Sequence, residues 1–502
     1  MLTALVFLPA VAAGILLCLP RTTPPLLVRA VWVAVSSVEV ALVLAVWAGH
    51  GSGGGMTHET RAVWIPSAGI GYHVGVDGLS LPLLALTAVL FWACAVHALR
   101  MTRRVRLLAA LFLFLETTCL GLFAALDLIL FFVFFDLSLV AMYFVIAGWG
   151  HRPGAPRAAV KFFLYTFTGS LALLLGFIGL YLSAAPHTFD MVALARGEVT
   201  AGRPLYGALV LLAVGAGLAI KTPTVPFHTW LPPAHTEAPA VGSAILAGVL
   251  LKMGTYGFLR IAMPLLPDRW REFALVFVVV GVVSVLYGAL VALAQRDFKR
   301  MIAYTSVNHM GYVLLALGAA AGSAGTADGA ARLAVSGAVF QMVSHGLLTG
   351  ALFLLAGVLY ERGRTYDMTA YSGLAARAPV FAALTGVAVF GSLGLPGLSG
   401  FVAEFQVLAG SLGPRPLATV LAVLGLLLTA ALLLGALRRV FLGPLRLPVA
   451  PGTGRPFPDV RRHEIAAVVP LLVLAVALGL FPRVVLDAIE PFSRTLLGLV
   501  GR

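Results

Sequence analysis

Fourteen long apolar runs divide the sequence, and they constrain the fold more than any other feature. A helix needs roughly 20 apolar residues to cross a bilayer, and only short polar stretches separate these runs. They therefore predict an all-α integral membrane protein of about 14 transmembrane helices. The runs lie at about 2–20, 30–48, 79–99, 106–125, 128–149, 160–183, 205–222, 240–263, 273–294, 301–320, 333–359, 378–412, 417–437 and 465–482.

The composition excludes a soluble globule. Of 502 residues, 60% are hydrophobic and 11% are charged, whereas an ordinary soluble domain carries roughly 25% charged residues. The net charge of +14 is interpreted as basic loops beside anionic lipid headgroups, not as a nucleic-acid surface. Cys18, Cys94 and Cys119 lie far apart inside apolar runs, so we expect no metal or iron–sulfur site in this chain.

Two of the runs contain helix-breaking residues. Pro223 and Pro226 follow the seventh run, and Gly394, Pro396 and Gly397 interrupt the twelfth. Proline removes a backbone donor and glycine loosens the backbone, so we expect helices 7 and 12 to be broken at membrane depth. Irregular backbone persists there only where protein or a wet cavity satisfies it. Two broken helices five spans apart are typical of two inverted repeats.

The matched breaks suggest four segments along the chain. We expect helices 1–3 in 1–104, a first five-helix repeat (helices 4–8) in 105–265, a second repeat (helices 9–13) in 266–440, and helix 14 with an interfacial tail in 441–502.

Basic residues in the loops predict the orientation. The loops after odd-numbered runs are the richer ones, so we expect these loops in the cytoplasm and both termini on the outer side. Arg260, Arg269 and Arg271, near the end of an even-numbered run, oppose this assignment. The residues that support it are Arg100, Arg103, Arg104, Arg106, Arg152, Arg157, Arg296, Lys299, Arg300, Arg362, Arg364, Arg377, Arg438, Arg439, Arg446, Arg455, Arg461 and Arg462.

Lysine is rare in this chain, and half of the lysines lie inside apolar runs. Lys161 and Lys299 are at run ends, whereas Lys221 and Lys252 are within the runs. A buried lysine is able to release its proton, but arginine stays charged in proteins. Because intramembrane charges mark functional sites by default, we interpret Lys221 and Lys252 as proton-transfer groups. The alternative is that both are structural partners of carboxylates.

Acidic residues inside the runs complement the lysines. Asp136 lies among phenylalanines in the fifth run, and Glu404 lies in the first turn after the second break. A carboxylate there faces the positive end of a helix dipole, and Lys221 faces the negative end of the other broken helix. Glu116 is a candidate for tuning Asp136, or a structural hydrogen-bonding residue. Glu39 has no partner that the sequence identifies.

Histidines extend this set. His309 and His345 lie within the tenth and eleventh runs, each beside hydroxyl-bearing residues. Neutral imidazole both donates and accepts hydrogen bonds, which suits a proton wire, although a lone buried histidine is as often a core residue. His228 adjoins the first break and is expected to order that loop. In chain order the predicted proton relay is Asp136, Lys221, Lys252, His309, His345 and Glu404, with water bridging any gaps.

Several motifs around these residues are similar to a known family. The sequence resembles the antiporter-like subunits of respiratory complex I (NADH-quinone oxidoreductase) along essentially its whole length. Glu404 and the motif at 250–257 point to subunit M (chain 4) among them, since the paralogues L and N usually carry lysine in place of the glutamate. The motifs are LAIKTP at 218–223, PFHTWLP at 226–232, AHTEAP at 234–239, LLKMGTYG at 250–257, GVDG at 75–78, DFKRMIAY at 297–304, SHG at 344–346 and GLPG at 394–397.

The resemblance implies a proton-translocating membrane subunit without a redox centre of its own. Quinone reduction elsewhere in the complex is expected to drive proton movement. Asp136 matches the fifth-helix carboxylate that pairs with the lysine at position 221, Lys252 the relay lysine, and Glu404 the terminal acid. The family usually has glutamate in place of Asp136 and aspartate in place of Pro233. The shorter side chain of Asp136 implies a weaker pair with Lys221 or a water between them.

The resemblance also implies partners and a location. FMN, iron–sulfur clusters and quinone are expected in other subunits, with no cofactor or metal in this chain. The expected partners are subunits L and N, small membrane subunits, the lipid bilayer, protons and internal water, and no nucleic acid. The expected location is a bacterial inner or plasma membrane.

Two other functions fit a membrane bundle with buried charges. One is a subunit of a multi-subunit sodium/proton antiporter or a related membrane-bound hydrogenase, against which Glu404 and the motif at 250–257 argue. The other is a scaffold that only joins neighbouring subunits, in which leucine would be tolerated at Lys221.

Overall fold

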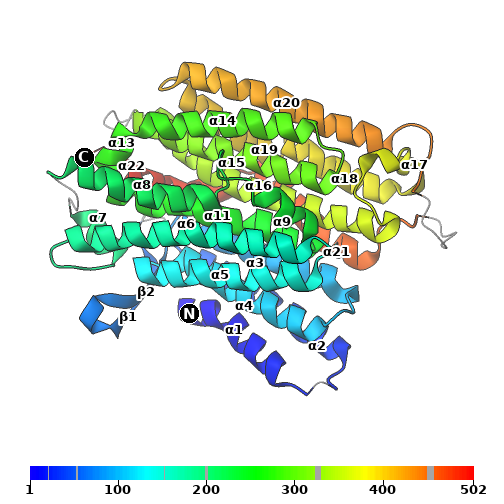
Figure 1. The fold of residues 1–502 in the computed structure, drawn as a ribbon, viewed down its shortest axis with the longest axis horizontal. Helices are drawn as coiled ribbons and strands as arrows, with labels where there is room; N and C mark the ends of the chain where they lie inside the picture. The colour runs from blue at the N-terminus through cyan, green and yellow to red at the C-terminus, as the bar shows by residue number, and fades with distance from the viewer. Residues whose placement is uncertain are drawn as a thin grey trace.

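The structure is a computed structural model of one chain, and it describes residues 1–20, 22–51, 55–151, 153–197, 202–322, 329–448 and 457–501. Of the arginines used above to predict the orientation, Arg152 and Arg455 lie outside these residues. Figure 1 shows a single bundle of roughly parallel helices, with α1 and α2 along one edge and α20 along the other. The β-hairpin, α7, α13 and the C-terminus lie at one end of the bundle, and α17 lies at the opposite end.

The α-helices account for every apolar run of the sequence. The long ones are α1 (Leu2–Cys18), α2 (Pro25–Ala48), α3 (Ser80–His97), α4 (Val105–Ala124), α5 (Leu128–Trp149), α6 (Ala155–Ser183), α8 (Pro204–Lys221), α14 (Ala274–Leu293), α15 (Phe298–Gly322), α16 (Gly329–Gly363), α18 (Pro379–Ser392), α19 (Ser399–Leu412), α20 (Pro416–Phe441), α21 (Arg462–Leu480) and α22 (Arg483–Val500). The short ones are α7 (Met191–Arg196), α9 (Leu231–Glu237), α10 (Ala240–Ile245), α11 (Leu251–Gly257), α12 (Met263–Leu265), α13 (Pro267–Glu272) and α17 (Leu374–Arg377).

Eleven helices in the described part of the chain are long and apolar enough to cross a membrane, which confirms a polytopic helical membrane protein. α1 and α18 are apolar but shorter, and α15 carries more polar residues. The count of fourteen crossings and the four segments stay predictions.

The centre of the bundle is tightly packed. The apolar stretches of α16 and of Ala240–Leu265 are completely buried, whereas only about a third of those in α2, α20 and α21 is buried. Small residues allow close approach at the centre. Gly281 of α14 and Gly311 of α15 face each other so closely that a β-carbon on Gly281 would lie 2.6 Å from the backbone nitrogen of Leu315. The α16 helix and the segment Ala240–Leu265 are therefore the innermost parts of the bundle.

Both predicted breaks are present. α8 ends at Lys221 and the chain resumes a helix only at Leu231. Inside this break the amide of Val225 donates to Ser284 Oγ at 3.0 Å, and Trp230 Nε1 donates to the carbonyl of Ile220 at 2.9 Å. Neighbouring protein thus satisfies backbone groups that lipid cannot.

The second break uses glycine. α18 ends at Ser392 and α19 begins at Ser399. Gly394 and Gly397 have φ values of +78° and +93°, the left-handed region that side chains other than glycine rarely adopt. The prediction that these glycines interrupt the twelfth run is confirmed.

Two features of the fold were not predicted. Strands β1 (Thr57–Ile65) and β2 (Ile70–Val76) form an antiparallel hairpin, so the fold is not purely helical. Such a strand is too short and polar to register as an apolar run. The eighth run is also irregular, with π-helical turns at Leu246–Leu250 and Phe258–Ala262 on either side of α11.

The amphipathic tail forms α22 as its sequence pattern suggested. Its apolar face, including Ile489, Phe492 and Leu496, is buried against the protein. Gly78 lies so close to the helix that a β-carbon there would be 1.9 Å from the carbonyl oxygen of Ala488. The apolar face of the tail therefore packs onto the bundle instead of onto lipid.

The three arginines that oppose the predicted orientation are each paired with an acid. Arg260 Nη2 lies 2.6 Å from Asp77 Oδ1, Arg271 contacts Asp268, and Arg269 contacts Glu272. The orientation rule counts arginine and lysine side chains and gives acidic residues little weight, so these pairs do not remove the objection to the predicted orientation. The assignment of sides stays a prediction.

Candidate functional site

The first cluster of predicted site residues lies where α5 meets the end of α8. Lys221 is 1% exposed, and its Nζ donates a 3.3 Å hydrogen bond to Ser138 Oγ on α5. The same ammonium lies 4.6 Å from the centre of the Phe135 ring. Lys221 therefore has a hydroxyl and a ring face as partners, not a carboxylate.

Asp136 lies on α5 near Lys221 without forming an ion pair with it, within the described residues. Its Oδ1 is buried and has no hydrogen-bond partner in the structure. The resemblance implied either a weakened pair or a bridging water, because aspartate is one methylene shorter than glutamate. The absence of an ion pair among the described residues agrees with both alternatives and does not decide between them.

The second cluster begins at Lys252, at the centre of the bundle. Its Nζ lies 2.6 Å from the carbonyl oxygen of Ala247 and 2.6 Å from Nδ1 of His345. Ala247 belongs to the π-helical turn before α11, and such turns leave backbone carbonyls less regularly bonded. The local irregularity of the eighth run therefore supplies one of the two partners of a fully buried lysine.

His345, His309 and Glu404 continue from Lys252 without interruption. The two imidazole rings meet edge to face with centres 5.2 Å apart. His309 Nε2 lies 3.6 Å from Glu404 Oε1 and 3.2 Å from the carbonyl oxygen of Ser392, the last residue of α18. Four predicted residues from four separate helices are thus in one row.

A small polar cavity lies beside this row. It is lined by His309, His345 and Glu404 together with Gln341, Ser344, Thr349 and Ser392. Its accessible volume of about 10 Å³ is close to the room that one water molecule needs. His345 Nε2, His309 Nδ1 and Glu404 Oε2 all lack protein partners, so a water here would have groups to bond.

The second break places Glu404. A β-carbon on Gly394 would lie 2.4 Å from Glu404 Oε2, so the carboxylate rests directly against the broken backbone. Glu404 is 3% exposed. It is the sixth residue of α19, so it lies in the second turn, and the prediction that it occupies the first turn is wrong.

The remaining predicted residues lie outside this row. His228 is buried in the first break, with its ring 5.0 Å from that of Tyr287 and 6.3 Å from that of Tyr304. Glu116 accepts a hydrogen bond from Ser36 of α2 at 3.2 Å. Its hydrogen-bond partner in the structure is therefore Ser36 and not Asp136.

His235 is a candidate that the sequence analysis missed. It lies on α9, is completely buried, and neither ring nitrogen has a hydrogen-bond partner. Its ring stacks on Phe353 of α16 with centres 4.5 Å apart, and it is within electrostatic range of Lys252. The AHTEAP motif contained this residue, but sequence spacing alone does not indicate that its ring stacks on Phe353 of α16.

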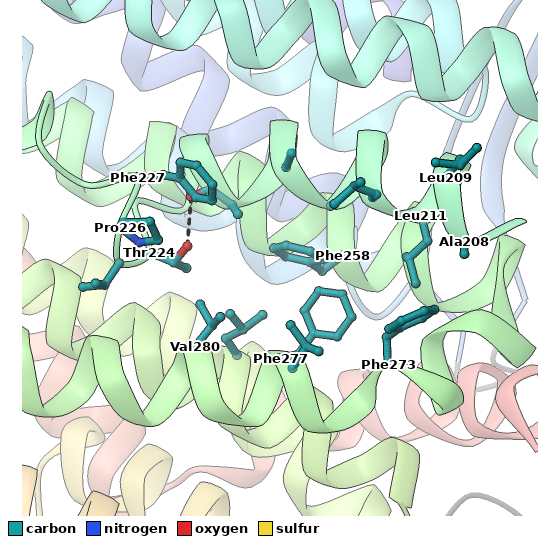
Figure 2. Close-up of a pocket in the computed structure, with 17 residues that line it drawn as sticks. Ala208, Leu209, Leu211, Thr224, Pro226, Phe227, Phe258, Phe273, Phe277 and Val280 are labelled. Carbon is teal, nitrogen blue, oxygen red and sulfur yellow. Dashed lines mark hydrogen bonds between the residues drawn. The ribbon is translucent and has the colours of Figure 1, made fainter. Parts of the chain in front are cut away.

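An apolar pocket of about 340 Å³ lies on the other side of the first break, between α8 and α14. Figure 2 shows Phe258, Phe273 and Phe277 along it, with Pro226 and Phe227 at the end next to the break. No ionisable side chain lines the pocket. Within the described ranges there is also no group of three or more histidine, cysteine or acidic side chains that would hold a metal ion.

Known proteins share this sequence and fold. Residues 125–429 match the family described as NADH:quinone oxidoreductase/Mrp antiporter, transmembrane. The NADH-quinone oxidoreductase subunit M of Rickettsia bellii is 42% identical over 431 residues, which cover 85% of this chain and 83% of that protein. The chain belongs to the subunit M family of NADH-quinone oxidoreductase.

Further similarity extends over the whole chain. The subunit M of Rhodobacter capsulatus is 38% identical and covers 98% of this chain and 95% of its own length. A chain of respiratory complex I from Thermus thermophilus superposes with a TM-score of 0.89 at 31% identity, with both chains fully covered. The Mrp complex of Dietzia sp. matches with a TM-score of 0.87, 100% of this chain and 99% of that chain, but at 23% identity this likeness shows the fold alone. The resemblance to complex I subunits is thereby confirmed, and all six predicted relay residues lie within the matched family region.

Proposed function

We propose that this subunit M family member translocates protons across the membrane as part of NADH-quinone oxidoreductase. One observation carries the proposal: Lys252, His345, His309 and Glu404 form a contiguous buried row through the middle of the bundle. A scaffold has no need of such a row, because unpaired ionisable groups inside a membrane protein are costly.

The chemistry of the row suits proton transfer. Lysine and histidine both accept and release protons, and a glutamate at the end of the row is able to do the same. Asp136 and Lys221 form the first part of the path and the row forms the second. Water must carry the proton between Lys221 and Lys252, because no direct contact joins them within the described residues.

Quinone reduction in another part of the complex drives this movement. FMN, iron–sulfur clusters and the quinone belong to other subunits in this proposal. Neighbouring membrane subunits, including L and N, hold the chain in the membrane arm. The likeness to a chain of complex I supports assembly with other subunits.

The proposal also includes the finer architecture. α4 to α12 would form one repeat and α14 to α20 an inverted second repeat, so that each contains one broken helix. The loops with free arginines would face the cytoplasm of a bacterial cell, with both termini outside.

Replacement of Lys252 by methionine tests the proposal most directly. Methionine fills a similar volume without a titratable group, so proton pumping by assembled complexes in vesicles should fall by roughly tenfold or more if this lysine carries the proton. NADH oxidation with a soluble artificial acceptor should persist. The matched control is Lys161→Met, because Lys161 is an exposed lysine on α6. Normal pumping by Lys252→Met complexes would contradict the proposal.

A further inference from the structure

A second buried acidic site lies in the N-terminal helices, outside the row described above. Glu39 of α2 and Glu116 of α4 are both 0% exposed. Ser36 donates to Glu116 Oε2 at 3.2 Å, and Ser36 precedes Glu39 by one turn on the same buried face of α2. The two carboxyl groups are therefore neighbours across the α2–α4 interface.

Most of the polar atoms of this site have no partner. Among the residues that the structure describes, both carboxyl oxygens of Glu39 and Oε1 of Glu116 lack a hydrogen bond. The indole nitrogen of Trp32, one turn before Ser36 on the same face, and the hydroxyl of Thr117, next to Glu116, are also buried without partners. Buried polar atoms in native proteins are nearly always hydrogen-bonded, so this group of unpartnered atoms indicates that a bound species supplies the missing hydrogen bonds.

The arginines of α2 and α4 have other partners, since Arg29 donates to the carbonyl oxygen of Met101 and Arg106 to that of Leu19. Among the described residues, neither acid forms an ion pair. The described titratable groups that face Glu116 from α3 and from its own helix are the thiols of Cys94 and Cys119. α1 carries no charged side chain. Two carboxylates side by side in a buried site cannot both be ionised.

We propose that Glu39 and Glu116 form a second proton-binding site, in which the two carboxyl groups share an exchangeable proton. A protonated carboxyl group donates a hydrogen bond. One proton between the two acids therefore gives one unpartnered oxygen of each carboxyl group a hydrogen-bond partner. The site is separate from the proposed relay: the matched family region begins at residue 125, and both acids precede it.

Infrared difference spectroscopy on the intact complex tests this site. The spectrum of the native complex minus that of the Glu39→Gln/Glu116→Gln double variant should contain the carbonyl-stretch band of a protonated carboxyl group at neutral pH. Because the proton is exchangeable, the band should shift in heavy water. Ser36→Ala should move the band without removing it, since only the hydrogen bond to Glu116 is lost.

Glu404→Gln is the matched control, because it removes a buried carboxyl group from the proposed relay and should leave the band of the pair unchanged. The single variant Glu116→Gln keeps the test available if the double variant fails to assemble; Glu39 alone should then give a displaced band. Absence of any carboxyl band would show that no proton is bound and would overturn the proposal. A band whose frequency does not shift in heavy water would also overturn the proposal, in favour of a structural acid with a proton that does not exchange. A band that changes when sodium replaces potassium would overturn it in favour of a cation site.

Discussion

The two halves of the proposed path differ in how their groups meet. In the first half, Lys221 bonds a serine hydroxyl and Asp136 stays apart from it. In the second half, each group from Lys252 to Glu404 is in contact with or close to the next. We call the part with Asp136 and Lys221 the open half, because its charged groups are not in contact, and the part from Lys252 to Glu404 the closed half. Only the open half needs water or side-chain movement to pass a proton, so proton transfer is most easily controlled there.

The two breaks differ in the same sense. Prolines and hydrogen bonds to neighbouring residues stabilise the backbone of the first break. The ammonium group of Lys221, at the start of this break, lies 4.6 Å from the centre of an aromatic ring. Glycines with positive φ hold the second break and bring the backbone against the carboxylate of Glu404. The first break therefore leaves its charge loosely partnered, whereas the second fixes its charge in a row.

The largest effect is expected at Lys221, the group that joins the open half to the rest. Lys221→Ala should reduce proton pumping and quinone-linked NADH oxidation by roughly tenfold or more, because an intramembrane charge of this kind is functional by default. Asp136→Ala should have a similar effect. Lys221→Arg should fail nearly as badly, since arginine keeps its charge and does not release a proton. Vesicle pumping assays on assembled complexes measure this, and normal pumping by Lys221→Ala would remove the first half from the path.

Glu404 tests the closed half. Glu404→Gln preserves shape and hydrogen bonding and removes only the ability to titrate, so assembled complexes should lose pumping by roughly tenfold. Glu404→Asp and Glu404→Lys should retain part of the activity, because both keep a titratable group. Glu490→Gln, on the partly exposed α22, is a control that should pump normally. If Glu404→Gln complexes pump as well, the proton leaves by another route.

The glycines of the second break separate backbone strain from the position of Glu404. Gly394→Ala and Gly397→Ala both place a β-carbon on a residue with positive φ, which costs roughly 1–2 kcal/mol. Only at Gly394 would that carbon also collide with Glu404, at 2.4 Å, whereas nothing lies within 4 Å at Gly397. Thermal unfolding should show similar losses of stability for both variants, and pumping should fall several-fold further in Gly394→Ala. Equal pumping by the two would show that the backbone does not position Glu404.

Local chemistry explains which of these features the sequence predicted. Pro223, Pro226 and the glycines from Gly394 to Gly397 break helices wherever they occur, so the breaks were predictable. Lys221 and Lys252 were identifiable from the sequence because burying an ammonium group in an apolar run is energetically costly.

Features that depend on the register between distant helices were not predictable. His235 stacks on Phe353 of α16 only because α9 packs against α6 and α15, and Glu39 lies near Glu116 only because one face of α2 packs on α4. The hairpin at 57–76 was missed because hydropathy reports membrane spans and says nothing about a short polar strand pair.

Asp136 offers a smaller test of the open half. Asp136→Glu lengthens the carboxylate by one methylene and should allow a direct ion pair with Lys221. Pumping should change by about twofold or less, because lysine keeps its ability to release a proton and only the mediator is replaced. Asp136→Asn, which cannot ionise, should instead lose most activity. A structure of Asp136→Glu in which the two charges remain apart would contradict the geometric part of this prediction.

The smallest effect concerns the loop network that anchors the start of α5 and hence the open half. Asp127, the N-cap of α5, accepts a hydrogen bond from the amide of Gly71 in the hairpin. His73 of the same hairpin lies 2.7 Å from Asp190 and 2.8 Å from Glu59. Protonation of the two acids that contact His73 should therefore loosen the anchor of α5.

The sign of the pH dependence follows from these contacts. Burial alone would raise the pKa of Asp190, but its hydrogen bonds to His73 and to the amide of Ala193 outweigh burial and hold the pKa below the usual value. The pKa of Glu59 is lowered in the same way by His73 and Arg61. Carboxylates with lowered pKa stabilise the fold above their unfolded pKa of about 4 and lose that contribution as the pH falls through the folded value. Asp190→Asn should therefore increase amide exchange in the hairpin and the first turn of α5 by a constant factor between pH 7 and pH 5, and that factor should shrink below a pH of about 4. A difference that grows as the pH falls would contradict this account of the anchor.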